Sequence, residues 1–296
     1  MASSSLRIAV GIATAGRRDV VRQTIGLLRD QTRLPDRLVV CPLVSDKINV
    51  SDFPHFPFPI IVTSGPVGLC AQRNAILEKA ADCDLIIFFD DDFLAEPHYL
   101  ERLEKIFQGN RNVCAVTGIL LADDVTGPGL TVEQGLGILQ SNIRNGEDIL
   151  EDVPGLYGCN MAFRMQYVRG NQLKFDENLP LYGWQEDIDF SLQMAPFGRL
   201  VRDHCLMGVH LGVKAGRTSG VRLGYSQIAN PVYLSKKGTM SWQYARKLIS
   251  RNIAANMARS LYPEPWIDRH GRLKGNFLAL MDLLRGKASP ARILQL

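Results

Sequence analysis

The stretch "LIIFFDDDF", residues 85–93, sets five successive apolar residues directly before three aspartates. An apolar run of this length predicts a strand that is buried on both faces, as in parallel sheets. Three adjacent carboxylates repel one another, and burying any of them without a partner is costly. The stretch therefore predicts either a solvated acidic loop or a site at which the carboxylates meet a positive charge.

The surrounding chain alternates between segments with a strand pattern and segments with a helical pattern. Strand patterns cover residues 6–14, 35–43, 60–63 and 113–120, and helical patterns cover residues 20–31, 69–81 and 97–107. This alternation predicts an α/β fold with a parallel, doubly wound sheet. Ligands of such sheets bind beyond the carboxyl ends of the strands. Asp90, Asp91 and Asp92 fall at such an end, which favours a site over a solvated loop.

The patterns weaken after residue 122. The glycine-rich residues 122–137 predict a long loop, and residues 156–164 predict a strand. Residues 185–195 predict a helix, with Gly198 in the left-handed conformation that often follows a helix. One or two strands are expected over residues 199–212, and two amphipathic helices from about residue 241 onward.

The composition is that of an ordinary globular protein, with 46% hydrophobic and 22% charged residues. No stretch approaches the ~20 apolar residues that span a bilayer. The N-terminus lacks the apolar segment of a secretory signal, and the six scattered cysteines form no CxxC pair. These features predict buried, reduced thiols and a cytoplasmic protein.

The charge is unevenly distributed along the chain. Residues 199–296 hold 17 Lys/Arg and 4 Asp/Glu, a balance of +13, whereas residues 1–198 hold 17 and 26, a balance of −9. The last two predicted helices combine basic with apolar residues, which suits contact with an anionic membrane. Packing on the main domain or on a second copy is the alternative. The predicted apolar face comprises Trp242, Leu248, Ile249, Ile253, Met257, Phe277, Leu278, Met281 and Leu284.

Two acidic motifs are candidates for chemistry. Asp90 and Asp92 form an Asp-X-Asp pair that can bind Mg²⁺ or Mn²⁺ and, through the cation, a diphosphate. The second motif, "GWQEDIDF", places Glu186, Asp187 and Asp189 at a helix start. These carboxylates could simply favour the positive end of the helix dipole, or one could be a general base.

Two further segments carry polar residues that suit an anionic ligand. "GLCAQRNAIL" places Arg73 and Asn74 early in a helix, where an arginine could contact a phosphate. "GVHLGVKAGRTSG" follows His210 with Lys214 and Arg217 among glycines. An imidazole on a metal and cations on phosphates would suit a metal–diphosphate site.

Taken together, the chain resembles the family 2 glycosyltransferases, inverting enzymes with the GT-A fold. The resemblance spans about residues 6–217. It rests, in order, on "IAVGIATAGR", "GLCAQRNAIL", "FFDDDF", "GCNMAFR" and "GWQEDIDFSLQM". The resemblance implies a mixed, mostly parallel GT-A sheet, a nucleotide-sugar donor, and Mg²⁺ or Mn²⁺ as cofactor.

The resemblance also implies roles for individual residues. The metal would be held by Asp90, Asp92 and His210. The donor nucleotide and its diphosphate would be bound by Thr14, Arg17, Asp46, Arg73, Asp90, Asp91, Lys214 and Arg217. Asp187 would be the catalytic base with Glu186 beside it, and Asn160 and Trp184 would contact the acceptor. Asp91 fills the middle of the metal motif, so which two of the three carboxylates face the metal stays open.

The resemblance thus implies a transferase that moves a sugar, preferably from a UDP-sugar, to a glycan or a lipid-linked acceptor in cell-surface polysaccharide synthesis. Residues 1–120 would bind the donor, residues 121–235 would bind the acceptor, and residues 236–296 would form a basic helical tail. The Gln-x-x-Arg-Trp motif of processive membrane synthases is missing, which favours single additions.

A sugar nucleotidyltransferase is the first alternative, although "TAGRRD" only faintly resembles its glycine-rich loop. A non-catalytic nucleotide-sugar or nucleic-acid binding module is the second, and the acidic main domain disfavours nucleic acid.

Overall fold

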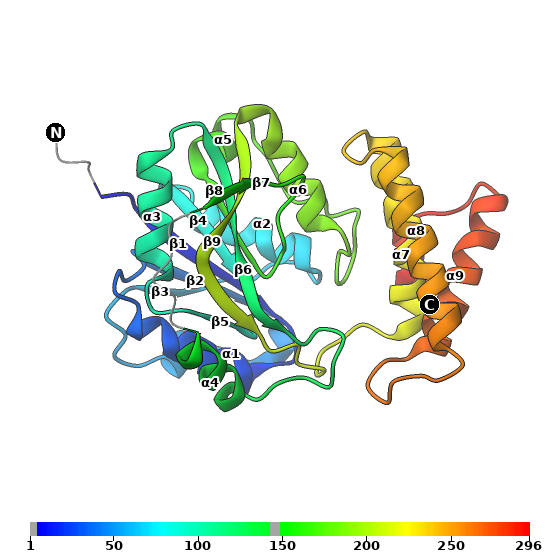
Figure 1. The fold of residues 1–296 in the computed structure, drawn as a ribbon, viewed down its shortest axis with the longest axis horizontal. Helices are drawn as coiled ribbons and strands as arrows, with labels where there is room; N and C mark the ends of the chain where they lie inside the picture. Colours follow the sequence, from blue (N-terminus) through cyan, green and yellow to red (C-terminus); the bar gives the residue numbers. More distant parts are fainter. Residues whose placement is uncertain (1–4, 143–148) are drawn as a thin grey trace.

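The computed structural model describes residues 5–142 and 149–296. It consists of an α/β body and a group of three long C-terminal helices at one end of the molecule (Figure 1). The body contains one sheet in the order β3-β2-β1-β4-β8-β6-β9-β5, with β7 paired to β9. The strands are β1 Ile8–Thr14, β2 Arg37–Pro42, β3 Ile60–Val62, β4 Leu85–Phe89, β5 Phe93–Ala95, β6 Val113–Asp123, β7 Leu150–Asp152, β8 Asn160–Arg164 and β9 Arg199–His210.

Strands β3, β2, β1 and β4 run parallel, and β8 lies antiparallel between β4 and β6. Helices flank this mixed, mostly parallel sheet, which confirms the predicted fold class (Figure 1). They are α1 Arg18–Leu27, α2 Leu69–Lys79, α3 Tyr99–Gly109, α4 Val132–Ser141, α5 Met165–Gly170 and α6 Glu186–Met194.

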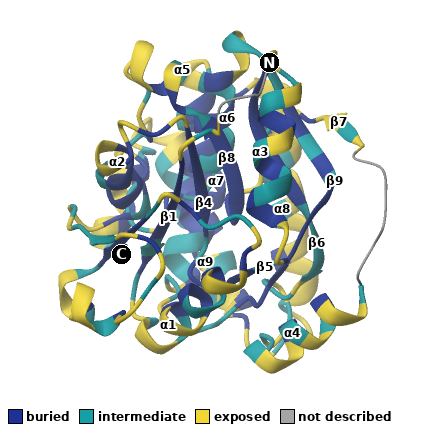
Figure 2. Ribbon diagram, turned by 90° about the vertical axis from the view of Figure 1, so that its left-hand side faces the viewer, coloured by how far each residue is buried: buried dark blue, intermediate teal, exposed yellow. Residues whose placement is uncertain are grey.

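Strand β4 lies in the middle of the body and is buried along its whole length (Figure 2). Its alternate side chains enter two apolar cores on opposite faces of the sheet. Leu85, Ile87 and Phe89 belong to one core, whereas Ile86 and Phe88 belong to the other. The uninterrupted apolar run is therefore explained, because helices cover both faces of the sheet.

The prediction of a long loop over residues 122–137 is wrong in part. Strand β6 continues to Asp123, and helix α4 begins at Val132 after a capping box in which Thr131 and Gln134 exchange hydrogen bonds. Gly135 lies within α4, and a Cβ at this position would lie only 2.6 Å from Leu94 Cδ1. The glycine thus permits close packing of α4 rather than a turn.

Two other local expectations differ from the structure. Gly198 has φ 160° and ψ −170°, so it is extended and not left-handed. The short strand β5 was not predicted, since it follows β4 after only three residues. By contrast, all six cysteines are buried and free, as predicted.

The C-terminal group comprises α7 Gly220–Lys237, α8 Trp242–Arg259 and α9 Arg269–Leu284, of which α7 was not predicted. Helices α7 and α9 pack through glycines, because a Cβ on Gly224 would lie 2.0 Å from the carbonyl oxygen of Arg272. Buried amides join all three helices: Asn256 Nδ2 donates to Gln227 Oε1 at 2.8 Å and to Asn276 Oδ1 at 2.9 Å. Among the described residues, no helix is both long enough and apolar enough to cross a bilayer.

The prediction of one apolar face on the last two helices is wrong in part. Ile249, Ile253 and Leu278 turn inward and pack with Tyr225 and Ile228 of α7. Their apolar surface is therefore used in holding the helices together. The large side chains that stay exposed include Trp242, Met257, Phe277 and Leu284.

Candidate active site

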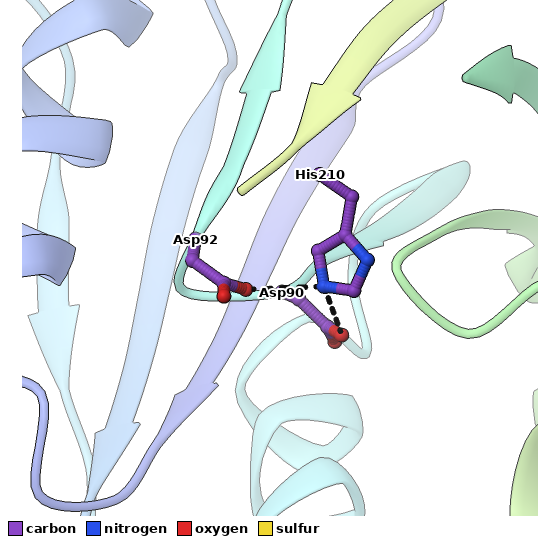
Figure 3. Close-up of side chains that lie close together, drawn as sticks. All are labelled: Asp90, Asp92 and His210. Atoms are coloured by element: carbon purple, nitrogen blue, oxygen red, sulfur yellow. Dashed lines mark ion pairs between the residues drawn. The ribbon is translucent and has the colours of Figure 1, made fainter. Parts of the chain in front are cut away.

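Asp90, Asp92 and His210 converge at the carboxyl end of β4 (Figure 3). His210 is the last residue of β9 and pairs with Phe93 of β5, which brings it to the aspartates. One ligand atom from each residue lies within 4.8 Å of the others. His210 Nε2 is 3.3 Å from Asp92 Oδ1 and 3.8 Å from Asp90 Oδ2.

The chemistry of this cluster fits a hard divalent cation. The side chain of Asp92 is only 1% exposed, and its Oδ2 accepts a hydrogen bond from the Val213 amide at 2.7 Å. Its Oδ1 lies 3.3 Å from His210 Nε2 and accepts no hydrogen bond from any other described residue. A buried carboxylate oxygen with this one contact is incompletely compensated, and a cation beside His210 Nε2 would satisfy it.

Asp123 orients His210, although sequence reasoning did not single it out. Its Oδ1 lies 2.9 Å from His210 Nδ1, and its Oδ2 accepts a hydrogen bond from Tyr157 Oη at 2.9 Å. Because Asp123 contacts the Nδ1 atom of His210, the Nε2 atom is the one that faces Asp90 and Asp92. Burial acts to lower the pKa of His210, but the bonds to Asp123 and Asp92 raise it to about 10. Asp123 fell in the segment expected to be a loop, so no local pattern marked it.

Asp91 faces away from the cluster. Its Oδ2 accepts a hydrogen bond from Thr14 Oγ1 at 2.6 Å, and its Oδ1 pairs with Arg17 Nη1 at 2.7 Å. Burial raises the pKa of Asp91 to about 6, against the opposing attraction of Arg17. Among the three carboxylates, Asp90 and Asp92 are therefore the two that share the space with His210.

The other basic residues expected at the donor diphosphate join two loops beside the cluster. Arg17 donates to the carbonyls of Val213 and Ala215 at 2.9 and 2.7 Å. Lys214 Nζ donates to the Asp124 carbonyl at 2.9 Å, and Arg217 Nη1 donates to the Val125 carbonyl at 2.9 Å. Burial and the neighbouring Arg217 lower the pKa of Lys214 to about 8.

Asp46 lies at the outer edge of this region. Both of its carboxylate oxygens accept from the Gly16 amide, at 3.1 and 3.0 Å. The loop after β1 and the turn after β2 are thereby joined beside the end of the sheet. Thr14, Arg17 and Asp46 thus lie near one another at the carboxyl ends of β1 and β2.

Arg73 is buried between the two acidic motifs. Its Nη1 pairs with Glu186 Oε1, and its Nη2 lies 3.2 Å from Asp90 Oδ1 and donates to the Gly158 carbonyl at 2.9 Å. The side chain is only 2% exposed, so its contacts are with protein groups. The arginine therefore connects the end of β4 to the start of α6.

Asp187 lines a cleft of about 1150 Å³ beside the metal cluster. Its Oδ2 accepts from the Gly158 amide at 3.0 Å, and its Oδ1 accepts from its neighbour Ile188 at 2.8 Å. Burial raises the pKa of Asp187. Burial also raises the pKa of Glu186 to about 8, because the loss of hydration outweighs the attraction of Arg73.

Asp189 lies on the same helix but faces away from the cleft. Its side chain is fully buried and accepts hydrogen bonds from Lys237 Nζ at 2.7 and 2.9 Å and from Thr239 Oγ1 at 2.6 Å. Asp189 therefore ties α6 to the end of α7 and to the turn before α8.

The cleft is lined by segments distant in sequence, including the turn that Asp189 holds. They are residues 117–120 of β6, residues 154–157 before β8, Gln185, Asp187, Ile188 and Leu192 of the α6 region, Arg202 of β9, and residues 238–241 and Tyr244 at the start of α8. Tyr157 and Tyr244 were missed by sequence reasoning, because nothing local to either residue points to the cleft.

The structure places the two residues expected to bind the acceptor, Asn160 and Trp184, at the start of β8 and just before α6. Asn160 has no exposed surface, and its Oδ1 accepts a hydrogen bond from Thr117 Oγ1 at 2.6 Å. Trp184 is half-buried just before α6, and its carbonyl accepts a hydrogen bond from Asn230 Nδ2 at 2.9 Å. Neither residue is among those that line the cleft.

An Asp-X-Asp pair at the end of a central strand, next to a cleft with a half-buried aspartate, is the arrangement expected of a glycosyltransferase of the GT-A fold. The family described as "Glycosyl transferase family 2" matches residues 9–170, more than half of the chain. The chain belongs to this family. Membership supports glycosyl transfer over nucleotidyl transfer and over a non-catalytic module.

Solved structures share the fold at low sequence identity. Mannosyltransferase PcManGT from Pyrobaculum calidifontis, in complex with GDP-Man and Mn²⁺, is 14% identical over 99% of this chain and 86% of its own, with a TM-score of 0.56. S. aureus TarS is 15% identical over 76% of this chain, with a TM-score of 0.52. GalNAc-T7 with UDP, GalNAc and Mn²⁺ is 12% identical over 99%, with a TM-score of 0.55.

The chain spans 40% of the length of that TarS chain and 56% of the length of GalNAc-T7. No curated protein sequence matches it.

Proposed function

We propose that this protein is a metal-dependent inverting glycosyltransferase. It would move a sugar from a nucleotide-diphosphate sugar, preferably a UDP-sugar, to a hydroxyl of a glycan or a lipid-linked acceptor in cell-surface polysaccharide synthesis. One observation carries the proposal: Arg73 joins Asp90 of the metal cluster to Glu186, the neighbour of Asp187. The proposed donor site and the candidate base would thus meet around one buried side chain.

On the donor side, Asp90, Asp92 and His210 would hold Mg²⁺ or Mn²⁺. The cation would supply positive charge against the donor diphosphate and the charge that grows on it as it leaves. Thr14, Arg17, Asp46 and Asp91 would border the nucleotide, while Lys214 and Arg217 would add positive charge beside the diphosphate. GDP-Man is bound in the mannosyltransferase and UDP in GalNAc-T7, so both kinds of donor belong in a test.

On the acceptor side, Asp187 would take the proton of the attacking hydroxyl. The hydroxyl oxygen then forms a bond to the anomeric carbon while the bond from that carbon to the diphosphate oxygen breaks on the opposite face, which inverts the configuration. Burial favours this role, because the raised pKa of Asp187 strengthens its carboxylate as a proton acceptor. Glu186, paired with Arg73, would hold the start of α6 beside Gly158.

The same proposal includes where the protein acts and how the chain is divided. Residues 1–120 would bind the donor and residues 121–235 the acceptor. Residues 236–296 would form a tail that brings a cytoplasmic enzyme to the inner face of the cell membrane. Helix α7, almost all of which precedes residue 236, packs against α8 and α9 and would support this tail. We expect no nucleic-acid partner, given the acidic balance of residues 1–198.

The test is a panel of UDP- and GDP-sugars, each with Mn²⁺, Mg²⁺ or EDTA. We expect one donor to raise the melting temperature only when a metal is present, and to be slowly hydrolysed. Asp92→Ala should lose the metal-dependent shift, whereas Asp187→Asn should keep the shift and lose turnover. The proposal fails if no donor in the panel stabilises the wild-type protein with either metal.

A further inference from the structure

Helix α9 carries an apolar stripe on the side that faces away from α7. Leu273, Phe277, Leu280 and Leu284 recur at spacings of three and four residues and therefore share one face of the helix. The exposed fractions of Phe277, Leu280 and Leu284 are 62%, 37% and 84%. The opposite face, with Gly275, Asn276 and Ala279, is buried. The apolar stripe is therefore not the face through which α9 packs against α7.

Basic side chains border the stripe without partners. Lys274 of α9 and Arg285, directly after the end of α9, flank it, and Lys247 and Arg251 are exposed on the neighbouring α8. All four are exposed, and none forms a hydrogen bond or an ion pair through its side chain in the part of the chain that the structure describes. Unpaired cations beside an apolar face suit an anionic partner.

The few acidic side chains of this region are already engaged. Residues 241–296 hold ten Lys/Arg and three Asp/Glu. Glu264 pairs with Arg259 at 2.6 Å and with Arg269 at 2.8 Å, and Asp282 accepts a hydrogen bond from Tyr225 Oη at 2.9 Å. Asp268 caps α9 by accepting from the Gly271 amide. The outward surface is thus left strongly basic.

We propose that the outward faces of α8 and α9 dock on an anionic phospholipid bilayer. The α9 stripe enters the interface between headgroups and acyl chains, and Lys247, Arg251, Lys274 and Arg285 contact the headgroup phosphates. An acidic protein surface would complement the cations but would leave the four apolar side chains without a nonpolar environment. A bilayer meets both requirements at once.

Docking here would also orient the enzyme. Helices α8 and α9 lie at one end of the molecule (Figure 1), and Tyr244 in the first turn of α8 lines the cleft that holds Asp187. One helix would therefore connect the bilayer surface to the acceptor cleft. The docking deepens the membrane contact included in the proposed function and rests on it, and this last step also assumes that the cleft accepts a lipid-linked hydroxyl.

The experiment is flotation of the full chain with vesicles of phosphatidylcholine alone or of equimolar phosphatidylcholine and phosphatidylglycerol. We expect binding only to the anionic vesicles, and release at ~1 M salt, where the screening length falls to ~3 Å. Replacing Lys247, Arg251 and Arg285 together by glutamine should lower the partition coefficient about a hundredfold, at about fivefold per charge. Phe277→Ser with Leu284→Ser should lower binding while leaving the melting temperature unchanged.

The matched control replaces Arg22, Arg111 and Lys174 by glutamine. These basic residues of the α/β body are also exposed and form no ion pair among the described residues, and the change in net charge is the same. Binding by the control should equal that of the wild type.

Three results would overturn the proposal: absence of binding to anionic vesicles, equal loss in the control, or a serine variant that converts a dimer to a monomer in light scattering without affecting flotation. The donor-induced melting shift is measured on the same samples. Its absence from the wild type would sink the glycosyltransferase assignment and leave the docking result standing.

Discussion

Asp187 and Asp189 lie two residues apart on α6, and the structure predicts opposite consequences when each is replaced by asparagine. Asp187 lines the cleft and accepts hydrogen bonds from two backbone amides. Asp189 is fully buried and is held by Lys237 and Thr239. We therefore expect Asp189→Asn to lower stability and Asp187→Asn to lower turnover.

The magnitude follows from the contacts of Asp189. Breaking a buried ion pair by removing one partner costs about 3–5 kcal/mol. Lys237 keeps its contact with Asp176 at 2.8 Å, and its side chain is 28% exposed, so the cost falls at the lower end, about 3 kcal/mol. For a chain of this size, we expect the melting temperature to fall by about 6 °C. Asp187→Asn retains a side-chain oxygen that can accept an amide hydrogen bond, and should change stability by no more than about 1 kcal/mol.

Scanning calorimetry and metal-dependent donor hydrolysis, well below the melting temperature, separate the two effects. Asp189→Asn should keep turnover within a few-fold of the wild type. Asp187→Asn should lose about 10²–10⁴-fold, the usual contribution of a general base. If Asp189→Asn melts like the wild type and yet loses turnover, the carboxylate acts in the chemistry and the anchoring role is wrong.

Three further predictions concern the helix packing, the metal and the pH profile. Gly224→Ala should destabilise the protein by about 1–3 kcal/mol, because the added methyl would meet a carbonyl oxygen at 2.0 Å. The control is Gly137→Ala in helix α4, where nothing lies within 4 Å of the new methyl; it should stabilise the protein by about 0.5–1 kcal/mol. Urea titration of both variants measures these changes, and an equal loss of stability in both would contradict the packing argument. Asp92→Ala should weaken Mn²⁺ binding at least about a hundredfold in calorimetric titration. Asp91→Asn should keep it within about tenfold, since Asp91 bonds Thr14 and Arg17 instead; equal losses would show that Asp91 shares the metal. Burial raises the pKa of Asp187 above its ordinary 3.8, and a general base must be unprotonated to act. Turnover should therefore fall about tenfold per pH unit below that raised pKa. A rate that is independent of pH in this range would exclude Asp187 as the base.

Much of the candidate site could be predicted because its residues follow local patterns. Asp90 and Asp92 come directly after a buried strand, and Asp187 lies in the first turn of a helix, so their neighbours in sequence mark them. The distinction between Asp187 and Asp189 could not be predicted in this way. It depends on which side of α6 meets Lys237, a residue 48 positions away from Asp189 in the chain.

Residues that act through a distant partner escaped sequence reasoning. Asp123 contacts His210 across 87 positions of the chain, and Tyr244 lines the cleft from the start of α8, after the turn whose Thr239 bonds Asp189. Arg73 was singled out by its motif, but its contacts with both Asp90 and Glu186 were not predicted. Such contacts depend on the packing of whole elements, for which no single segment carries a signal.

The amino-acid sequence by itself determined the alternation of strands and helices, the burial of β4 on both faces, and the placement of carboxylates at its end, because each of these depends on the periodicity and polarity of neighbouring residues. Only the tertiary structure decided which aspartates face His210, which side of α6 enters the cleft, and which apolar side chains of the last helices remain outside. Those outcomes depend on the close approach of segments far apart in the chain. Backbone-to-backbone packing at Gly224, and hydrogen bonds that satisfy buried polar atoms such as those of Asp91 and Asp189, select one arrangement among those that the local patterns allow.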